Sequence, residues 1–218
     1  GVMFNLPARD GLETLRPGPT ILPTSGNVGA QYTPAAGWAQ AIRYREQVLA
    51  EADWSGALAV ACGGDGSVAA NGFWAALNIA TTLQLPMLFF IEDNGFGLSV
   101  PAAMQTPGGN IATNLRAYGG LKVLEGDGGE LHTTWGLIQE AITHIRDGLG
   151  PCLLRMAVPR LSGHTFIDDQ SYKPAETLAE DAECDPIDRL SQVWQQAGYT
   201  LEAWTGLQAE VHTELQQA

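Results

Sequence analysis

The sequence predicts an α/β fold in which a doubly wound, mostly parallel sheet is flanked by helices and followed by a C-terminal helical extension. Two observations carry this prediction: short apolar runs bounded by glycine or charged residues, and helical apolar patterns between them. A length of 218 residues suits one such domain with a sizeable core. We divide the chain into an N-terminal loop segment, an α/β domain and an acidic helical extension: residues 1–25, 26–175 and 176–218.

The first half of the chain alternates between helix and strand patterns. Residues 1–25 contain four prolines and no apolar period, which indicates surface loop, and residues 34–50 have helical spacing. A continuous apolar run at 57–62 stops at two glycines and is typical of a buried parallel strand. Residues 73–83 read as a helix that is apolar nearly all round and should be covered on every side. Residues 86–91 form a second buried strand.

The second half repeats the alternation and then changes character. We expect a strand at 121–124, a helix at 131–147 and a strand at 152–158. After Pro174 the chain contains nine acidic residues and one base, with helix patterns around 186–197 and 201–217. The C-terminal extension therefore carries −8 of the net charge of −13.

Composition excludes several classes of partner. The chain has 24 acidic and 11 basic residues and a net charge of −13, which argues against nucleic acid and anionic lipid. No apolar run reaches the roughly 20 residues that a membrane helix needs, so no membrane partner is expected. Three widely spaced cysteines support neither a disulfide framework nor a zinc site and favour a reducing, cytoplasmic location.

The most informative segment is a Gly-Asp-Gly turn after the first strand. Its glycines half match a dinucleotide fingerprint, but Asp65 would repel a bare pyrophosphate. A magnesium diphosphate removes that conflict, because magnesium takes carboxylate, amide and carbonyl oxygens. Asn94 ends the next strand, and parallel neighbours about 4.8 Å apart place both side chains at one sheet edge. We predict that Asp65, Asn94 and the carbonyl of Phe96 hold magnesium.

Two alternatives belong beside this hypothesis. Gly64-Asp65-Gly66 and Asp93-Asn94-Gly95 can each be an ordinary strand-ending turn. A second Gly-Asp-Gly copy, Gly126-Asp127-Gly128, is interpreted as a plain turn because no asparagine follows Asn114. A nicotinamide-dependent dehydrogenase of the Rossmann type would use Gly64 and Gly66. It would also need an acid about 20 residues further on, near Gln84, where none occurs.

Several motifs together resemble one family. Gly64-Asp65-Gly66 and Asn94-Gly95-Phe96-Gly97 are similar to the thiamine-diphosphate motif, and residues 26–31 and 160–172 resemble two further segments of the alpha subunit of 2-oxo acid dehydrogenases, pyruvate and branched-chain type. The resemblance covers about residues 25–200. It implies a thiamine-diphosphate-binding fold and oxidative decarboxylation of a 2-oxo acid, with acyl transfer to a lipoyl group on a partner acyltransferase.

The resemblance also implies site residues. Gly26 and Val28 would contact the aminopyrimidine of the cofactor, and Gly66 and Ser67 would lie along its diphosphate. Asp65, Asn94 and Phe96 would hold Mg²⁺. Arg160 and His164 would lie on the loop that closes over the active centre, with His164 as the catalytic residue. Thr165 occupies a position that some members phosphorylate.

Other features depart from the family pattern. Asp93 replaces the first of two asparagines, Lys173 replaces an arginine after Tyr172, and the helix after Gly66 lacks its usual acids and histidine. The chain begins without the family's upstream cofactor-binding segment, and the glutamate that activates the aminopyrimidine belongs to a beta subunit or a fused beta region. We therefore expect the chain to need a beta partner, or to be a catalytically degenerate, non-enzymatic partner subunit.

Overall fold

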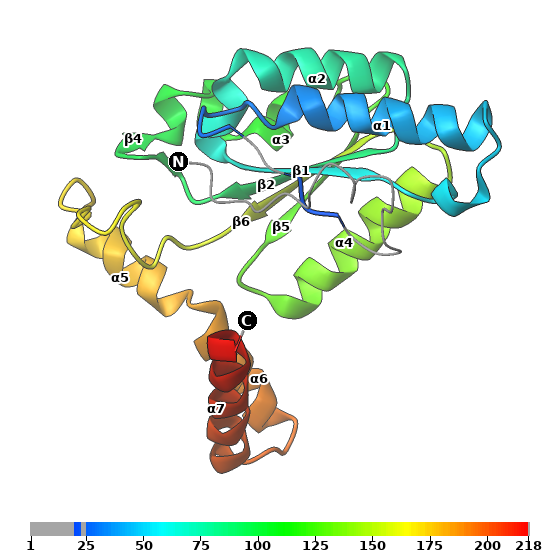
Figure 1. Ribbon diagram of the computed structural model, residues 1–218. Helices are drawn as coiled ribbons and strands as arrows, with labels where there is room; N and C mark the ends of the chain where they lie inside the picture. The colour runs from blue at the N-terminus through cyan, green and yellow to red at the C-terminus, as the bar shows by residue number, and fades with distance from the viewer. Residues whose placement is uncertain (1–19, 23–24, 218) are drawn as a thin grey trace.

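A four-stranded parallel sheet forms the centre of the molecule (Figure 1). The computed structural model describes residues 20–22 and 25–217, so the predicted N-terminal loop segment lies largely outside the described residues. The strands in chain order are β1 (Ala59–Gly64), β2 (Met87–Asp93), β5 (Lys122–Asp127) and β6 (Cys152–Ala157). Their spatial order is β1-β2-β6-β5, and every neighbouring pair is parallel. The predicted α/β class with a parallel sheet is confirmed.

Strands β1, β2 and β5 run further toward their carboxyl ends than the apolar runs predicted, whereas β6 ends at Ala157, one residue before its predicted end. Gly63 and Gly64 remain in β1 because their backbones pair with Ile91 and Glu92 of β2. The ladder between β2 and β6 likewise continues to Asp93, which pairs with Ala157. Backbone pairing does not need an apolar side chain, so the glycine and acidic residues that seemed to stop each strand form its last pairs instead.

Helices cover the two faces of the sheet. Helices α1 (Tyr32–Gln47), α2 (Asn71–Thr82) and α3 (Ile111–Leu115) contribute to one apolar core, and α4 (Leu131–Arg146) to a second core with β2 and β6. Figure 1 shows α1 and α2 together on one side of the sheet and α4 on the other. The arrangement is that of a doubly wound α/β layer.

Helix α2 corrects one prediction. It is not covered on every side: Trp74 and Ile79 are 42% and 41% exposed, whereas Phe73 and Leu77 are fully buried. A helix that is apolar all round requires cover on its outer face, and the described part of the chain supplies cover only on the inner one.

Short elements connect the strands to the helices at the carboxyl edge. A 3₁₀ turn, η3 (Asp65–Ala69), follows β1, and a small antiparallel ribbon of β3 (Phe96–Gly97) and β4 (Val100–Pro101) follows β2. The remaining 3₁₀ turns are η2 (Ala52–Trp54), η4 (Ala102–Met104) and η5 (Pro107–Gly109).

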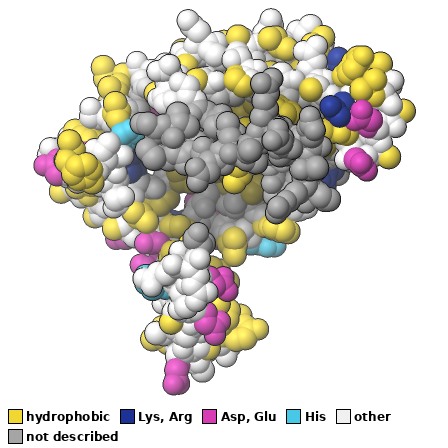
Figure 2. Space-filling view, viewed as in Figure 1, with side chains coloured by type: hydrophobic (Ala, Val, Ile, Leu, Met, Phe, Trp, Pro, Cys, Tyr) yellow, Lys and Arg dark blue, Asp and Glu magenta, His cyan; other side chains and the backbone are white. Residues whose placement is uncertain are grey.

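Three helices end the chain: α5 (Ala175–Glu183), α6 (Pro186–Gln196) and α7 (Leu201–Gln217). The sequence patterns indicated α6 and α7 but not α5. Figure 1 shows α6 and α7 projecting from the sheet layer, and Figure 2 shows acidic side chains along them. Arg189 of α6 pairs with Asp127 at 2.9 Å. The second Gly-Asp-Gly triplet is a turn in which Asp127 Oδ1 accepts the backbone N–H of Gly129 at 2.8 Å, and the ion pair with Arg189 is a contact that the sequence did not predict.

No helix among the described residues is long and apolar enough to cross a membrane.

Candidate functional site

The carboxyl ends of β1 and β2 place the two predicted metal-binding segments side by side. The strands are neighbours in parallel register, with Gly64 opposite Glu92. Asp65 follows β1 directly, and Asn94 follows β2 directly. The adjacency that the sequence argument required is therefore present, since the carboxyl ends of parallel neighbours meet at one edge.

Asp65 is the central group of this edge. Its residue exposure is only 4%, and its Oδ2 is a buried oxygen without a hydrogen-bond partner among the described residues. Burial raises the pKa of this carboxyl above its usual value, the nearby charge of Asp93 raises it further, and backbone N–H groups of Asp65 and Asn94 oppose the shift. A buried carboxylate oxygen with no donor is costly unless a cation binds it. The site thus fits a cation.

The segment after β2 is a tight turn that presents oxygens beside Asp65. Asn94 Oδ1 accepts a hydrogen bond from the backbone N–H of Phe96 at 3.1 Å, and Gly95 has a φ of +80°, a left-handed conformation that favours glycine. The carbonyl oxygen of Phe96 accepts a hydrogen bond from Arg160 Nη2 at 2.7 Å. The Phe96 carbonyl oxygen, the third predicted ligand, is therefore hydrogen-bonded to the Arg160 guanidinium. Its second lone pair remains available for a cation.

Gly66 brings the two turns into close contact. A Cβ atom at Gly66 would lie 3.0 Å from the Cα of Gly97 and 3.2 Å from Oε1 of Gln105. Only a residue without a side chain lets the η3 turn approach the ribbon this closely. Gln105 is a residue of this edge that the sequence analysis missed; its Nε2 donates to the carbonyl of Val100 at 2.8 Å.

Ser67 braces the η3 turn from inside. Its hydroxyl donates to the carbonyl of Gly64 at 2.6 Å and is also 2.6 Å from the hydroxyl of Tyr32. Burial raises the pKa of Tyr32 to about 12. The side chain of Ser67 is therefore engaged within the fold. Tyr32 directly follows the 26–31 segment, and that position was the only signal that could have found it.

The segment 26–31 reaches the η3 turn with its second half only. Gly29 has a φ of +82° and lies so close to Ala70 that a Cβ there would meet the Ala70 Cβ at 2.4 Å. Gln31 Nε2 donates to the carbonyl of Cys62 at 3.0 Å. Gly26 is exposed, and Val28 is 72% exposed.

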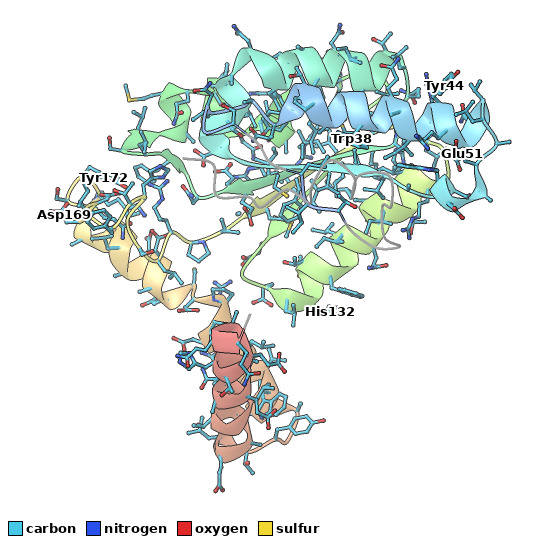
Figure 3. All side chains as sticks on the ribbon, viewed as in Figure 1. Trp38, Tyr44, Glu51, His132, Asp169 and Tyr172 are labelled. Carbon is cyan, nitrogen blue, oxygen red and sulfur yellow. The ribbon has the colours of Figure 1, made fainter. Side chains whose placement is uncertain are left out.

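The loop that carries Arg160 and His164 lies against the ribbon. Arg160 Nη1 donates to the carbonyl of Leu98 at 2.5 Å and to the hydroxyl of Tyr172 at 3.0 Å. Figure 3 shows Tyr172 in the loop that leads to α5. Asp168 accepts the backbone N–H of His164 at 2.7 Å, and this bond is the first cause of the lowered pKa of Asp168. The side chain of His164 is exposed.

Lys173, which stands where the family pattern has an arginine, is also part of this region. Its side chain is fully buried, pairs with Asp181 of α5 at 2.6 Å and lies 5.2 Å from the ring centroid of Phe96. The substitution therefore keeps a cation behind the Phe96 turn.

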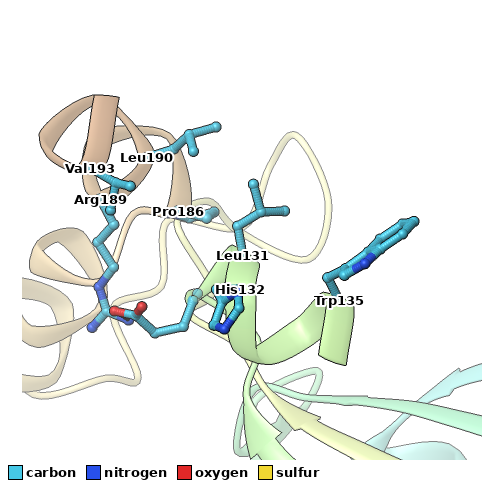
Figure 4. Close-up of a pocket in the computed structure, with 9 residues that line it drawn as sticks. Leu131, His132, Trp135, Pro186, Arg189, Leu190 and Val193 are labelled. Atoms are coloured by element: carbon cyan, nitrogen blue, oxygen red, sulfur yellow. Dashed lines mark ion pairs between the residues drawn. The ribbon is translucent and has the colours of Figure 1, made fainter. Parts of the chain in front are cut away.

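A cavity of about 340 Å³ lies elsewhere, between the first turn of α4 and α6 (Figure 4). Its walls are mainly apolar and include Leu131, Trp135 and Leu190. It contains none of the predicted site residues. No group of three or more His, Cys, Asp or Glu side chains suited to a metal occurs in the described ranges. Magnesium needs only one or two protein carboxylates when phosphates complete its shell, so Asp65 with amide and carbonyl oxygens is a sufficient donor set.

Comparisons with known proteins identify the family of this chain. The family model described as "Dehydrogenase E1 component" matches residues 8–218. The chain is 31% identical over 170 residues to the pyruvate dehydrogenase E1 component subunit alpha of Mycoplasma genitalium, covering 78% of this chain and 45% of that protein. It is 30% identical over 179 residues to the 3-methyl-2-oxobutanoate dehydrogenase subunit alpha of Mycobacterium tuberculosis, covering 81% and 46%.

A third relative extends the match. The pyruvate dehydrogenase E1 component subunit alpha of Zymomonas mobilis is 29% identical over 196 residues, which cover 89% of this chain and 52% of that protein. The chain thus spans about half the length of the curated relatives it matches. These matches give no support to a nicotinamide-dependent dehydrogenase.

Proposed function

Because this chain belongs to the dehydrogenase E1 component family, we propose that it is the alpha part of the decarboxylating component of a 2-oxo acid dehydrogenase complex. The observation that carries the proposal is the unpaired, buried Oδ2 of Asp65 beside Asn94 among the described residues. The reaction is the oxidative decarboxylation of a 2-oxo acid with transfer of the acyl group to a lipoyl group.

The cofactor proposed for this edge is thiamine diphosphate with Mg²⁺, in a thiamine-diphosphate-binding fold. Asp65 and Asn94 supply a carboxylate and an amide oxygen to the cation, and the Phe96 carbonyl is the third ligand. Gly66 lets the diphosphate approach the backbone of η3, and the backbone of Ser67 lies beside it. Gly26 and Val28 are assigned to the aminopyrimidine, on the strength of the motif alone.

When bound, the cofactor serves as an electron sink for the carboxylate-bearing carbon of the substrate. The residues of this chain position and enclose it. Arg160 ties the 160–172 loop to the ribbon through the carbonyls of Phe96 and Leu98, so His164 is carried on a loop anchored next to the cation site. From there His164 donates a hydrogen bond to an anionic oxygen of the diphosphate or of the substrate.

A beta subunit, or a beta region of the same polypeptide, completes the active centre. Support comes from the uncovered outer face of α2, where Trp74 and Ile79 are exposed. A lipoyl-bearing acyltransferase is the proposed acceptor of the acyl group. The described cysteines Cys62, Cys152 and Cys184 are all free, which supports a reducing, cytoplasmic compartment.

The test uses the full chain assembled with its beta partner. Calorimetry should show thiamine diphosphate binding that requires Mg²⁺ and disappears with a chelator. The assembled enzyme should then decarboxylate pyruvate or 3-methyl-2-oxobutanoate in the presence of an artificial electron acceptor.

Two outcomes would contradict the proposal in different ways. Cofactor binding without turnover of any 2-oxo acid would make this chain the degenerate partner subunit. Absence of magnesium-dependent binding would remove the cofactor assignment altogether.

A further inference from the structure

A buried ion pair lies directly behind the Asn94 turn and has no role in the reaction as described so far. Asp93, the last residue of β2, is 5% exposed, and its Oδ2 accepts a hydrogen bond from Arg155 Nε at 2.6 Å. Arg155 lies on the neighbouring strand β6, and its side chain is 18% exposed. Its Nη1 is 3.5 Å from Oε2 of Glu125 on β5. One guanidinium thus connects three adjacent strands at the edge where the site lies.

The same carboxylate shapes the turn. The Oδ1 of Asp93 accepts the backbone N–H of Gly95 at 2.9 Å, and its backbone carbonyl accepts the N–H of Val158 at 2.9 Å. Asn94 lies between the two residues that this side chain joins. An Asp side chain that bonds the backbone two residues on fixes the conformation of the residue between them. The position of Asn94 opposite Asp65 therefore depends on how Asp93 is held.

Arg155 also compensates the negative charge of Asp93. Asp65 and Asp93 are both buried carboxylates at one edge, and only Asp93 has a cationic partner at hydrogen-bond distance. An uncompensated second carboxylate would repel an anionic diphosphate and compete with Asp65 for the cation. The buried charge of Asp93 must therefore be balanced, and Arg155 is the cation that lies at hydrogen-bond distance from it.

We propose that Arg155 and Asp93 form a positioning pair for the cofactor turn: Arg155 neutralises Asp93 and holds it so that Asn94 meets the cation bound at Asp65. The identity of that cation and its diphosphate rests on the proposed function. The restraint that Arg155 and Asp93 place on the Asn94 turn does not rest on that function, because it acts in the cofactor-free protein as well.

The experiment compares four variants in the full chain assembled with its partner: Arg155→Gln, Arg155→Lys, Asp93→Asn and the double variant Asp93→Asn/Arg155→Gln. Asparagine at 93 keeps an oxygen for the Gly95 N–H and removes the charge. Lys122→Gln is the matched control, because Lys122 lies on β5 of the same sheet and pairs with Glu140 of α4 at 2.9 Å, away from the turn. Amide hydrogen exchange of residues 94–97 is measured without cofactor, and thiamine diphosphate affinity at saturating Mg²⁺ is measured by calorimetry.

Arg155→Gln should speed exchange of residues 94–97 and weaken cofactor affinity about ten- to a hundredfold, the usual effect of losing a group that supports a metal ligand. The double variant should bind nearly as well as Asp93→Asn, since both charges are then gone, and Arg155→Lys should recover part of the loss. Lys122→Gln should match the wild type in both measurements.

A purely structural pair would lower the melting temperature and leave the affinity of the folded variants unchanged, and that result overturns the inference. So does a double variant that binds no better than Arg155→Gln. If the wild-type assembly binds no magnesium diphosphate, the proposed function fails. Hydrogen exchange of residues 94–97 then tests the inference by itself. Faster exchange in Arg155→Gln supports the proposal that Arg155 and Asp93 restrain the turn, and unchanged exchange overturns it.

Discussion

Replacing Asp65 by asparagine should stabilise the cofactor-free protein and abolish cofactor binding. In the metal-free state the carboxylate is 4% exposed, and its Oδ2 lacks a donor among the described residues. Leaving such a group unsatisfied costs about 1–3 kcal/mol. Asn keeps the shape but removes the buried charge and its repulsion from Asp93. Because the neutral amide still lacks a partner at the position of Oδ2, the free energy of unfolding should rise by about 1 kcal/mol, the low end of that range. The carboxylate that binds the cation is lost at the same time.

The pKa of Asp65 adds a pH signature to this prediction. Burial raises the pKa of its carboxyl above the usual 3.8, so the folded state binds a proton more tightly than the unfolded state. The wild-type protein therefore loses stability as the pH rises through the folded-state pKa, and Asp65→Asn does not. The stability gap between variant and wild type should widen with increasing pH above 3.8.

The assay is urea denaturation with a chelator present, paired with calorimetric titration of thiamine diphosphate and Mg²⁺. Asp127→Asn is the matched control, because Asp127 lies in the second Gly-Asp-Gly triplet but pairs with Arg189 and is half exposed. It should lose at most about 1 kcal/mol and leave cofactor binding unchanged. The reasoning is refuted if Asp65→Asn is less stable than the wild type without metal, or if it still binds the cofactor with magnesium.

Three further predictions concern the neighbourhood of this edge. Tyr32→Phe should lower the free energy of unfolding by about 1 kcal/mol. The wild type should lose stability as the pH rises from the usual tyrosine pKa of 10.0 to about 12, because the folded phenol stays protonated there while the unfolded one ionises. Tyr32→Phe should not show this loss. Denaturation at pH 8 and pH 11 tests both statements. Gly66→Ala should weaken cofactor affinity, because its Cβ would lie 3.0 Å from the Cα of Gly97. Gly206→Ala in α7, with nothing within 4 Å of its Cβ, serves as the comparison for an added methyl group. Burial raises the pKa of Cys152 to about 12, so a thiol reagent should modify Cys62 in the native protein and reach Cys152 only on unfolding; early modification of Cys152 would contradict its burial.

The sequence alone was sufficient for the parallel sheet and for the adjacency of the Asp65 and Asn94 segments. Four apolar runs, with helix patterns between the first and second and between the third and fourth, indicate parallel strands, since a strand buried on both faces needs apolar side chains throughout. The positions of Asp65 and Asn94 just after two such runs were enough to predict that they meet. That inference needed only local patterns and the geometry of one crossover between neighbouring strands.

The tertiary structure decided which side chains support the site. Arg155 reaches Asp93 only because β6, and not β5, lies next to β2, and a strand order of β1-β2-β6-β5 leaves no trace in apolar periodicity. The contact of Tyr32 with Ser67, the pairing of Arg189 with Asp127 and the uncovered face of α2 likewise depend on how distant segments pack. Local patterns report each segment's preference for helix or strand, whereas long-range side-chain contacts depend on the order in which the finished elements assemble.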